Sequence, residues 1–190
     1  MPQFSYTAHM SEFQRPPKID VMQAGLASQQ LAGHDLLSNY KRLMAETNGL
    51  GANNSLDWSA RGELQPGQTG QPQAWLHLSV RVSLPLTCQR CLGPVDVPLQ
   101  IERVFRFVET EAQAELEDDA SIEDVLVLSH DFDLATLIED EVLMDLPVVP
   151  RHEACPLPVK SAAVDADFED VQPKPNPFSV LAGLKIPSKR

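Results

Sequence analysis

The sequence predicts an α+β fold in which an antiparallel sheet is packed by a few helices. Residues 56–64, 74–84 and 95–108 each alternate apolar and polar side chains, and short turn-like stretches join them. Alternation with a period of two places every second side chain on one face of a sheet, and consecutive alternating strands favour an antiparallel meander. Three long neighbouring strands curl as they twist, so the pattern leaves an open sheet and a barrel-like closure as alternatives.

The remaining elements follow from local patterns on either side of these strands. Residues 19–22 are predicted as an edge strand, and residues 35–47 as a helix because apolar residues recur there at helical spacing. Residues 109–124 hold eight acidic residues and are predicted to form a mobile acidic loop. A short buried strand is expected at 125–128, followed by a helix over 133–145 that Asp133 caps.

The length of the chain, 190 residues, suits one sizeable core with a tail left over. We therefore expect a single α+β domain over residues 1–160. Residues 161–190 are rich in Ala, Asp and Pro, which predicts a flexible C-terminal tail. This tail carries the segment Lys174-Pro-Asn-Pro-Phe178 and ends in a basic tip.

Charge is distributed unevenly along the chain. The net charge is −12, and residues 107–150 contain fourteen Asp and Glu but no Lys or Arg. This distribution argues against a protein that coats nucleic acid by charge, since neutralising phosphates needs clustered Lys and Arg. The same distribution is compatible with local RNA contacts or with binding of basic ribosomal proteins. A plainly solvated acidic face is the alternative.

The composition also predicts a cytoplasmic protein without a membrane segment. No apolar run reaches the roughly 18–20 residues that a membrane helix needs. The N-terminus lacks the basic start and the apolar stretch of a signal peptide. Three cysteines, an odd number, favour a reducing compartment over a disulfide framework.

All three cysteines fall in two short pairs, Cys88–Cys91 and His152–Cys155. A two-residue spacer suits a tetrahedral ion, because a tight turn aims both side chains at one point. A site with one nitrogen and three sulfur donors would be a closed structural zinc site. Two other interpretations are small buried or unliganded thiols, and a redox C-x-x-C motif, although this motif does not follow a βα junction.

No pattern of residues indicates catalysis or a small-molecule substrate. The chain has no P-loop, no G-x-G-x-x-G, no G-x-S-x-G and no H-E-x-x-H. The residues alone therefore favour a binding or scaffold protein over an enzyme.

Three blocks of sequence resemble a known family. They are LTCQRCLGPV at 86–95, EDEVLMDLPVVPRH at 139–152 and KPNPFSVLAGLK at 174–185. In this order they closely resemble the YceD family, the bacterial large ribosomal RNA subunit accumulation proteins. The resemblance spans residues 86–185.

The resemblance implies a role in the synthesis, processing or accumulation of 23S ribosomal RNA, with no known catalytic residues. The implied partners are 23S ribosomal RNA or its precursor, an early large-subunit particle, or large-subunit ribosomal proteins. Two alternatives belong to other classes: an acidic adaptor that binds a basic ribosomal protein without touching RNA, and a C-x-x-C thiol oxidoreductase.

Candidate RNA- or partner-binding residues lie at the turn between the first cysteine pair and in the tail. Arg90 would sit at the tip of a metal-braced turn. Phe178 would stack on an exposed base or fill a protein pocket, unless residues 176–184 dock on the protein's own body. The full set is Arg90, Lys174, Asn176, Pro177, Phe178, Lys185, Lys189 and Arg190.

Overall fold

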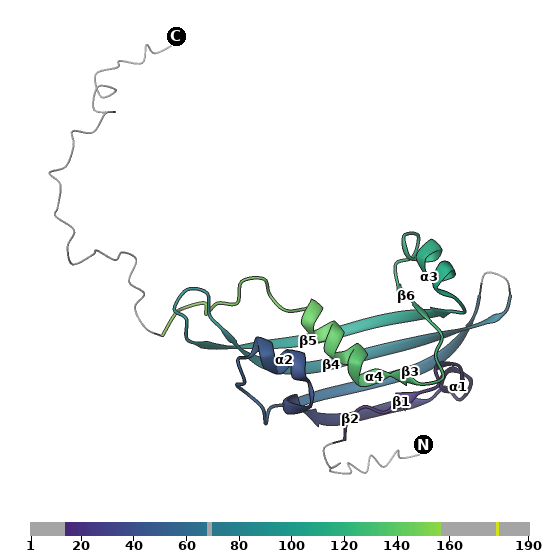
Figure 1. Cartoon of the computed structure of the whole chain (residues 1–190), viewed down its shortest axis with the longest axis horizontal. Coiled ribbons are helices and arrows are strands. Elements are labelled where there is room, and N and C mark those ends of the chain that lie inside the picture. Colours follow the sequence, from purple (N-terminus) through teal and green to yellow (C-terminus); the bar gives the residue numbers. More distant parts are fainter. Residues whose placement is uncertain (1–13, 68–69, 157–177, 179–190) are drawn as a thin grey trace, which may run out of the picture. The chain divides into compact units, whose positions relative to one another are not determined.

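The computed structural model describes residues 14–67, 70–156 and 178, and within them the fold is α+β. A five-stranded sheet with the order β2-β3-β4-β5-β6 forms its centre (Figure 1). Strands β2 to β5 pair antiparallel, whereas β6 pairs parallel with β5. The bounds of these strands are β2 Gln30–Leu36, β3 Ser55–Pro66, β4 Pro72–Thr87, β5 Pro94–Val108 and β6 Asp124–Val127.

The predicted meander is confirmed, and its strands are longer than the sequence indicated. Trp58 pairs with Val80, and Val80 with Ile101, so the apolar positions of three strands share one face. These side chains are buried, as the alternating pattern requires. The sheet ends in two edges, β2 and β6, so it is open and the barrel-like alternative is wrong.

Helices cover the apolar face of the sheet. Helix α1 (Val21–Leu26) packs on β3 and β4, and α4 (Leu134–Met144) packs on β5 and on α2 (Lys41–Glu46). The cap at Asp133 is confirmed, because its carboxylate accepts a hydrogen bond of 3.0 Å from the backbone N–H of Thr136. Gly62 allows α1 its close approach, since a Cβ there would lie 2.6 Å from the carbonyl carbon of Ala24.

Two N-terminal predictions are wrong. The segment predicted as a helix over 35–47 begins as the end of β2, passes through a 3-10 turn (η1, Leu37–Asn39) and becomes helical only at α2. Pairing with β3 outweighs the helical spacing. The predicted edge strand at 19–22 is limited to β1 (Lys18–Ile19), which pairs with β7 (Phe132–Asp133). Asp20 then caps α1 by accepting from the N–H of Gln23.

The acidic stretch 109–124 contains a helix, α3 (Glu111–Asp118), where the sequence predicted only a loop. The Thr110 hydroxyl caps α3 by accepting from the Gln113 N–H. Arg106 of β5 is buried and donates to Glu117 and Ser121, so one of the few cations nearby is used to hold this stretch. Helix α3 also connects β5 to its parallel neighbour β6.

Among the described residues, no helix is long and apolar enough to cross a membrane.

Candidate metal centre

The first cysteine pair lies in the tight turn that joins β4 to β5. The backbone N–H of Cys88 donates to the Gly93 carbonyl at 2.9 Å, and the N–H of Leu92 donates to the Cys88 carbonyl at 2.9 Å. Leu92 adopts a left-handed conformation, with φ of 59°, which lets the chain reverse and enter β5. We call residues 88–93 the knuckle. Its geometry brings the side chains of Cys88 and Cys91 to one side of the turn.

The second pair reaches the knuckle by way of α4. Helix α4 ends at Met144, and the chain then continues to the knuckle. There the Pro150 carbonyl accepts a hydrogen bond of 2.8 Å from the N–H of Gln89. This backbone contact places His152 beside the knuckle, with its Nδ1 atom 3.5 Å from the Sγ atom of Cys91. No pattern in the sequence indicated the Gln89–Pro150 contact, because it joins two main-chain groups.

The structure thus brings together Cys88, Cys91, His152 and Cys155, the four residues that the spacing of the two pairs indicated. Their candidate ligand atoms all lie within 4.8 Å of one another. In a tetrahedral zinc site, bond lengths of about 2.3 Å to sulfur and 2.0 Å to nitrogen imply ligand separations of about 3.8 Å for two sulfurs and 3.5 Å for sulfur and nitrogen. The separation of Cys91 and His152 already equals the second value. The cluster fits a metal ion if its longest separations, which are within 4.8 Å, shorten by about 1 Å.

Burial and hydrogen bonding shift the pKa of the Cys88 thiol in opposite directions. The Cys88 side chain is fully buried, which disfavours the thiolate. The backbone N–H groups of Cys91, His152 and Arg90 point at its sulfur and outweigh burial, lowering the pKa to about 5. Burial and the neighbouring Cys91 and Cys88 instead raise the pKa of Cys155. Several N–H donors on one sulfur are the outer-shell support that a metal thiolate needs.

Four protein donors leave no open position for water, so this centre suits bracing and not Lewis-acid catalysis. A bound ion would fasten the segment that follows α4 to the hairpin of β4 and β5. These two parts of the chain are 61 residues apart at the Cys91–His152 contact.

The predicted binding residues divide into two groups. Arg90 is exposed on the knuckle, while its backbone N–H supports the Cys88 sulfur. Phe178 is 69% exposed. The other predicted tail residues lie outside the described residues: Lys174, Asn176, Pro177, Lys185, Lys189 and Arg190.

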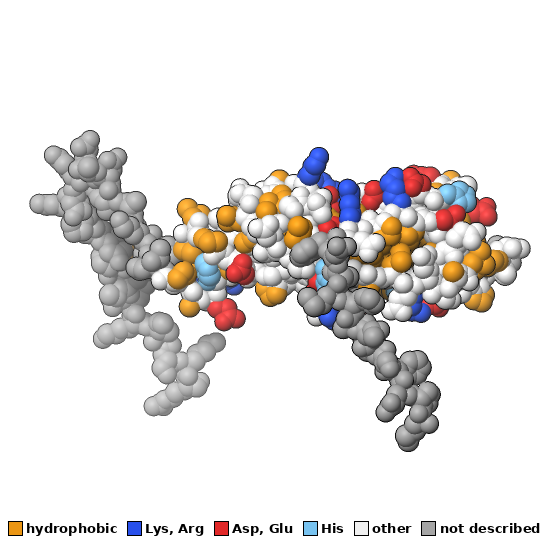
Figure 2. Space-filling view, turned by 90° about the horizontal axis from the view of Figure 1, so that it is seen from below, with side chains coloured by type: hydrophobic (Ala, Val, Ile, Leu, Met, Phe, Trp, Pro, Cys, Tyr) orange, Lys and Arg blue, Asp and Glu red, His pale blue; other side chains and the backbone are white. Residues whose placement is uncertain are grey.

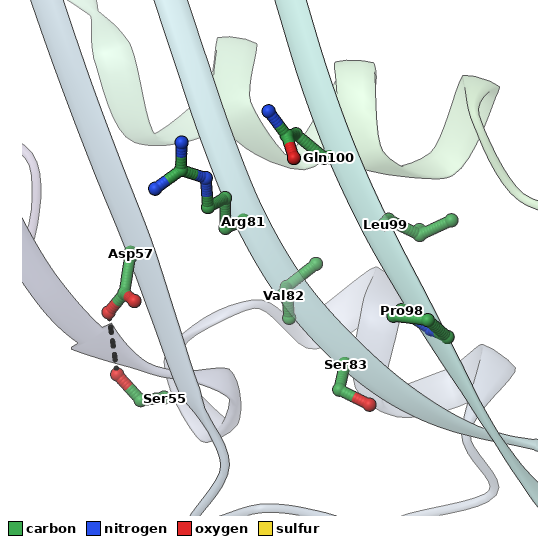
Figure 3. A pocket seen from close by; sticks show the side chains of 8 residues that line it. All are labelled: Ser55, Asp57, Arg81, Val82, Ser83, Pro98, Leu99 and Gln100. Carbon is green, nitrogen blue, oxygen red and sulfur yellow. Dashed lines mark hydrogen bonds between the residues drawn. The ribbon is translucent and has the colours of Figure 1, made fainter.

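A shallow groove of about 390 Å³ opens between β3, β4 and β5, away from the metal centre. Arg81 and Gln100 are paired in register across β4 and β5, and their side chains extend along the groove (Figure 3). Asp57 accepts a hydrogen bond from the Ser55 hydroxyl and also contacts His34. The sequence did not single out this groove, whose lining comprises Ser55, Asp57, Arg81, Val82, Ser83, Pro98, Leu99 and Gln100.

Comparison with known proteins agrees with the resemblance noted above. The sequence model of the family described as large ribosomal RNA subunit accumulation protein YceD matches residues 76–185, which include all four residues of the candidate metal centre. The protein of that name from Haemophilus influenzae is 34% identical over 110 residues, or 56% of this chain and 62% of that protein. The match therefore spans less than two-thirds of the curated relative. No solved structure matches this chain significantly. Because the family model covers more than half of its residues, the chain belongs to the YceD family.

Proposed function

We propose that this protein is a cytoplasmic, non-enzymatic factor in the formation of the large ribosomal subunit. It would support the synthesis, processing or accumulation of 23S ribosomal RNA by binding that RNA or an early large-subunit particle. The family match carries the proposal, since the relative is named for accumulation of the large ribosomal RNA subunit. The metal centre supports it, because a closed donor set suits a scaffold better than a catalyst.

We further propose that zinc occupies the centre formed by Cys88, Cys91, His152 and Cys155. Three sulfur donors and one imidazole favour zinc over calcium or magnesium, which take oxygen ligands. When bound, the ion would supply only cross-linking between the knuckle and the segment after α4. It would thereby fix the knuckle as a rigid projection from the end of the sheet.

Arg90 is the residue that such a rigid knuckle would present to RNA. Its backbone N–H is one of those directed at the Cys88 sulfur, while its side chain is exposed. A guanidinium binds phosphate in a bidentate manner, and a fixed turn removes the backbone part of the entropy loss. A few contacts of this type would allow selective binding by a protein whose net charge of −12 opposes bulk association with RNA.

Crosslinking of the protein in cells, followed by sequencing of the attached RNA, tests this function. Crosslinks to 23S ribosomal RNA or its precursor are expected, and Arg90→Ala should reduce them. Arg61→Ala is the matched control, because Arg61 is an exposed arginine of β3 that pairs with Glu63. Crosslinks confined to protein would favour the acidic adaptor instead. Equal losses in both variants would contradict the role of Arg90.

The burial of Cys88 disfavours the thiol oxidoreductase alternative. A catalytic thiolate must be accessible to its substrate, yet Cys88, the thiol whose pKa is lowered, has no exposed surface. Alkylation after mild reduction separates the two cases. An oxidoreductase would expose a fast-reacting cysteine, whereas a zinc centre would protect all three cysteines until a chelator is added.

A further inference from the structure

Exposed apolar side chains gather at the end of the sheet that carries the metal centre. Leu92 is 76% exposed on the knuckle, and Val148 is 97% exposed in the segment that follows α4. Val149, also exposed, precedes Pro150, whose carbonyl contacts Gln89. Hydrophobic side chains are visible at this end of the described body, beside histidine and acidic side chains (Figure 2). We call Leu92, Val148 and Val149 the knuckle-end patch.

Isolated exposed apolar residues are ordinary, but a group of them on a braced turn is not. Leu92 occupies a left-handed position, where a leucine is strained and a glycine would be at ease. A large apolar residue held there in solvent has no role in the core. The backbone contact between Gln89 and Pro150 keeps the two halves of the patch together.

We propose that the knuckle-end patch is the docking surface for a basic protein of the large ribosomal subunit. The proposal rests on the proposed function for the identity of the partner, because formation of the large subunit supplies such proteins. Aliphatic side chains suit a protein surface, since RNA bases are held by aromatic stacking and by hydrogen-bond donors. The patch contains no aromatic residue.

The net charge of the chain favours a partner of the opposite charge. Close to the patch in the sequence, exposed charges of both signs occur, Asp96 and Glu153 beside Arg90 and Arg151, so the local charge is balanced. The whole chain carries a net charge of −12, which attracts a cationic protein and speeds its association. The same charge disfavours a second copy of this chain as the occupant.

The test uses the full-length protein with a photo-crosslinking amino acid, p-benzoylphenylalanine, placed at position 148. The matched control carries the same group at position 122, because Ile122 is 99% exposed but lies beside α3, far along the chain from the patch. Purified large-subunit ribosomal proteins are added separately as probes. We expect position 148 to crosslink to at least one basic protein to which position 122 does not.

The affinity for that protein is then measured with charge-introducing variants. Val148→Glu should raise its Kd about tenfold or more, whereas Ile122→Glu should leave it nearly unchanged. Both positions are fully solvated, so thermal melting should confirm that both variants fold. Arg61→Ala, which removes an exposed charge on β3, should leave this Kd within about twofold.

Every other crosslinking result overturns the proposal. These results are no crosslink to any purified ribosomal protein, equal crosslinks from both positions, or crosslinks from position 148 to RNA, to a second copy or to residues 157–190 of the same chain. A chain that crosslinks to 23S ribosomal RNA in cells but to none of the purified proteins would retain the proposed function and lose only this docking surface.

Discussion

Cys88 is the residue on which the centre depends, because it is fully buried and its sulfur receives several backbone N–H groups. Cys88→Ser should lose about one equivalent of zinc per chain, measured by elemental analysis. Structural metal binding contributes directly to folding, so the free energy of unfolding should fall by several kcal/mol and the Tm by about 10 °C. Thr87→Ser, at the neighbouring half-buried position, should change neither quantity. Metal-free protein from a preparation without chelator would contradict the assignment.

His130 and Asp20 form a hydrogen-bonded pair, and the titration of His130 can be measured. The His130 Nδ1 atom lies 2.6 Å from an Asp20 carboxylate oxygen, and this hydrogen bond raises the pKa of His130 above the usual 6.5. Its stabilising effect is therefore complete below the usual histidine pKa and is lost as pH rises through the raised value. The same hydrogen bond lowers the pKa of Asp20.

Asp20→Asn should return the pKa of His130 towards 6.5 in an NMR titration. Asparagine still caps α1, so the helix should remain and the change should be confined to the charge. An unchanged pKa of His130 in this variant would show that the pair does not form in solution.

At the scale of elements, what the sequence could predict was local. The alternation around Trp58, Leu78 and Ile101 depends only on neighbouring residues, and the strands that contain them were predicted. The true path of residues 30–36 depends on pairing with β3, which helical spacing at Leu36 and Leu37 does not register. Long-range pairing overrode local preference there.

The candidate metal centre was likewise predictable only in its local parts. Spacing identified each pair, because Cys88 and Cys91 share one turn. The meeting of the pairs depends on where α4 ends and on the contact between Gln89 and Pro150. No local pattern encodes that contact. The sequence could therefore propose the ligands but not fix their separation.

Arg103 of β5 forms ion pairs with Glu141 of α4 and with Asp145, which follows α4. Its substitution therefore tests the packing of α4 on β5. Its Nε atom lies 3.2 Å from Glu141, which is buried, and its Nη2 atom lies 3.6 Å from Asp145. Arg103→Ala should cost about 1.5–3 kcal/mol in the free energy of unfolding, because Glu141 keeps its charge without its partner. Arg61→Ala, which breaks the exposed pair with Glu63, should cost less than about 1 kcal/mol.

The cost of Arg103→Ala should depend on pH. Burial raises the pKa of Glu141 even though Arg103 opposes it, and removal of Arg103 raises this pKa further. The penalty for the unpaired charge is therefore present above the raised pKa and shrinks as pH falls through it. Urea unfolding at neutral and at mildly acidic pH measures the difference. A cost that does not fall on acidification would show that Glu141 is solvated.

At the scale of the whole molecule, we propose that the chain divides into a folded domain over 1–160 and a tail over 161–190 that engages the partner. The tail includes the third block of family resemblance and Phe178. Deletion of residues 174–190 should leave the Tm unchanged and abolish cosedimentation with the large-subunit precursor. Deletion of residues 186–190 alone is a control that preserves the family block. Unfolding of the longer deletion, or undiminished cosedimentation, would contradict the proposal.

Cys91 and His152 are 61 positions apart in the sequence, so the two halves of the cluster are synthesised at different times. The hairpin of β4 and β5 leaves the ribosome well before the second half of the cluster has been made. Neighbouring strands can pair early because their contacts span few residues, so the sheet does not need the ion as a template. Under the proposal that zinc binds, the ion would join a nascent chain whose sheet already exists. Zinc supply would then govern the completion of each new molecule, and a cell short of zinc would accumulate chains with a formed sheet and an unfastened end.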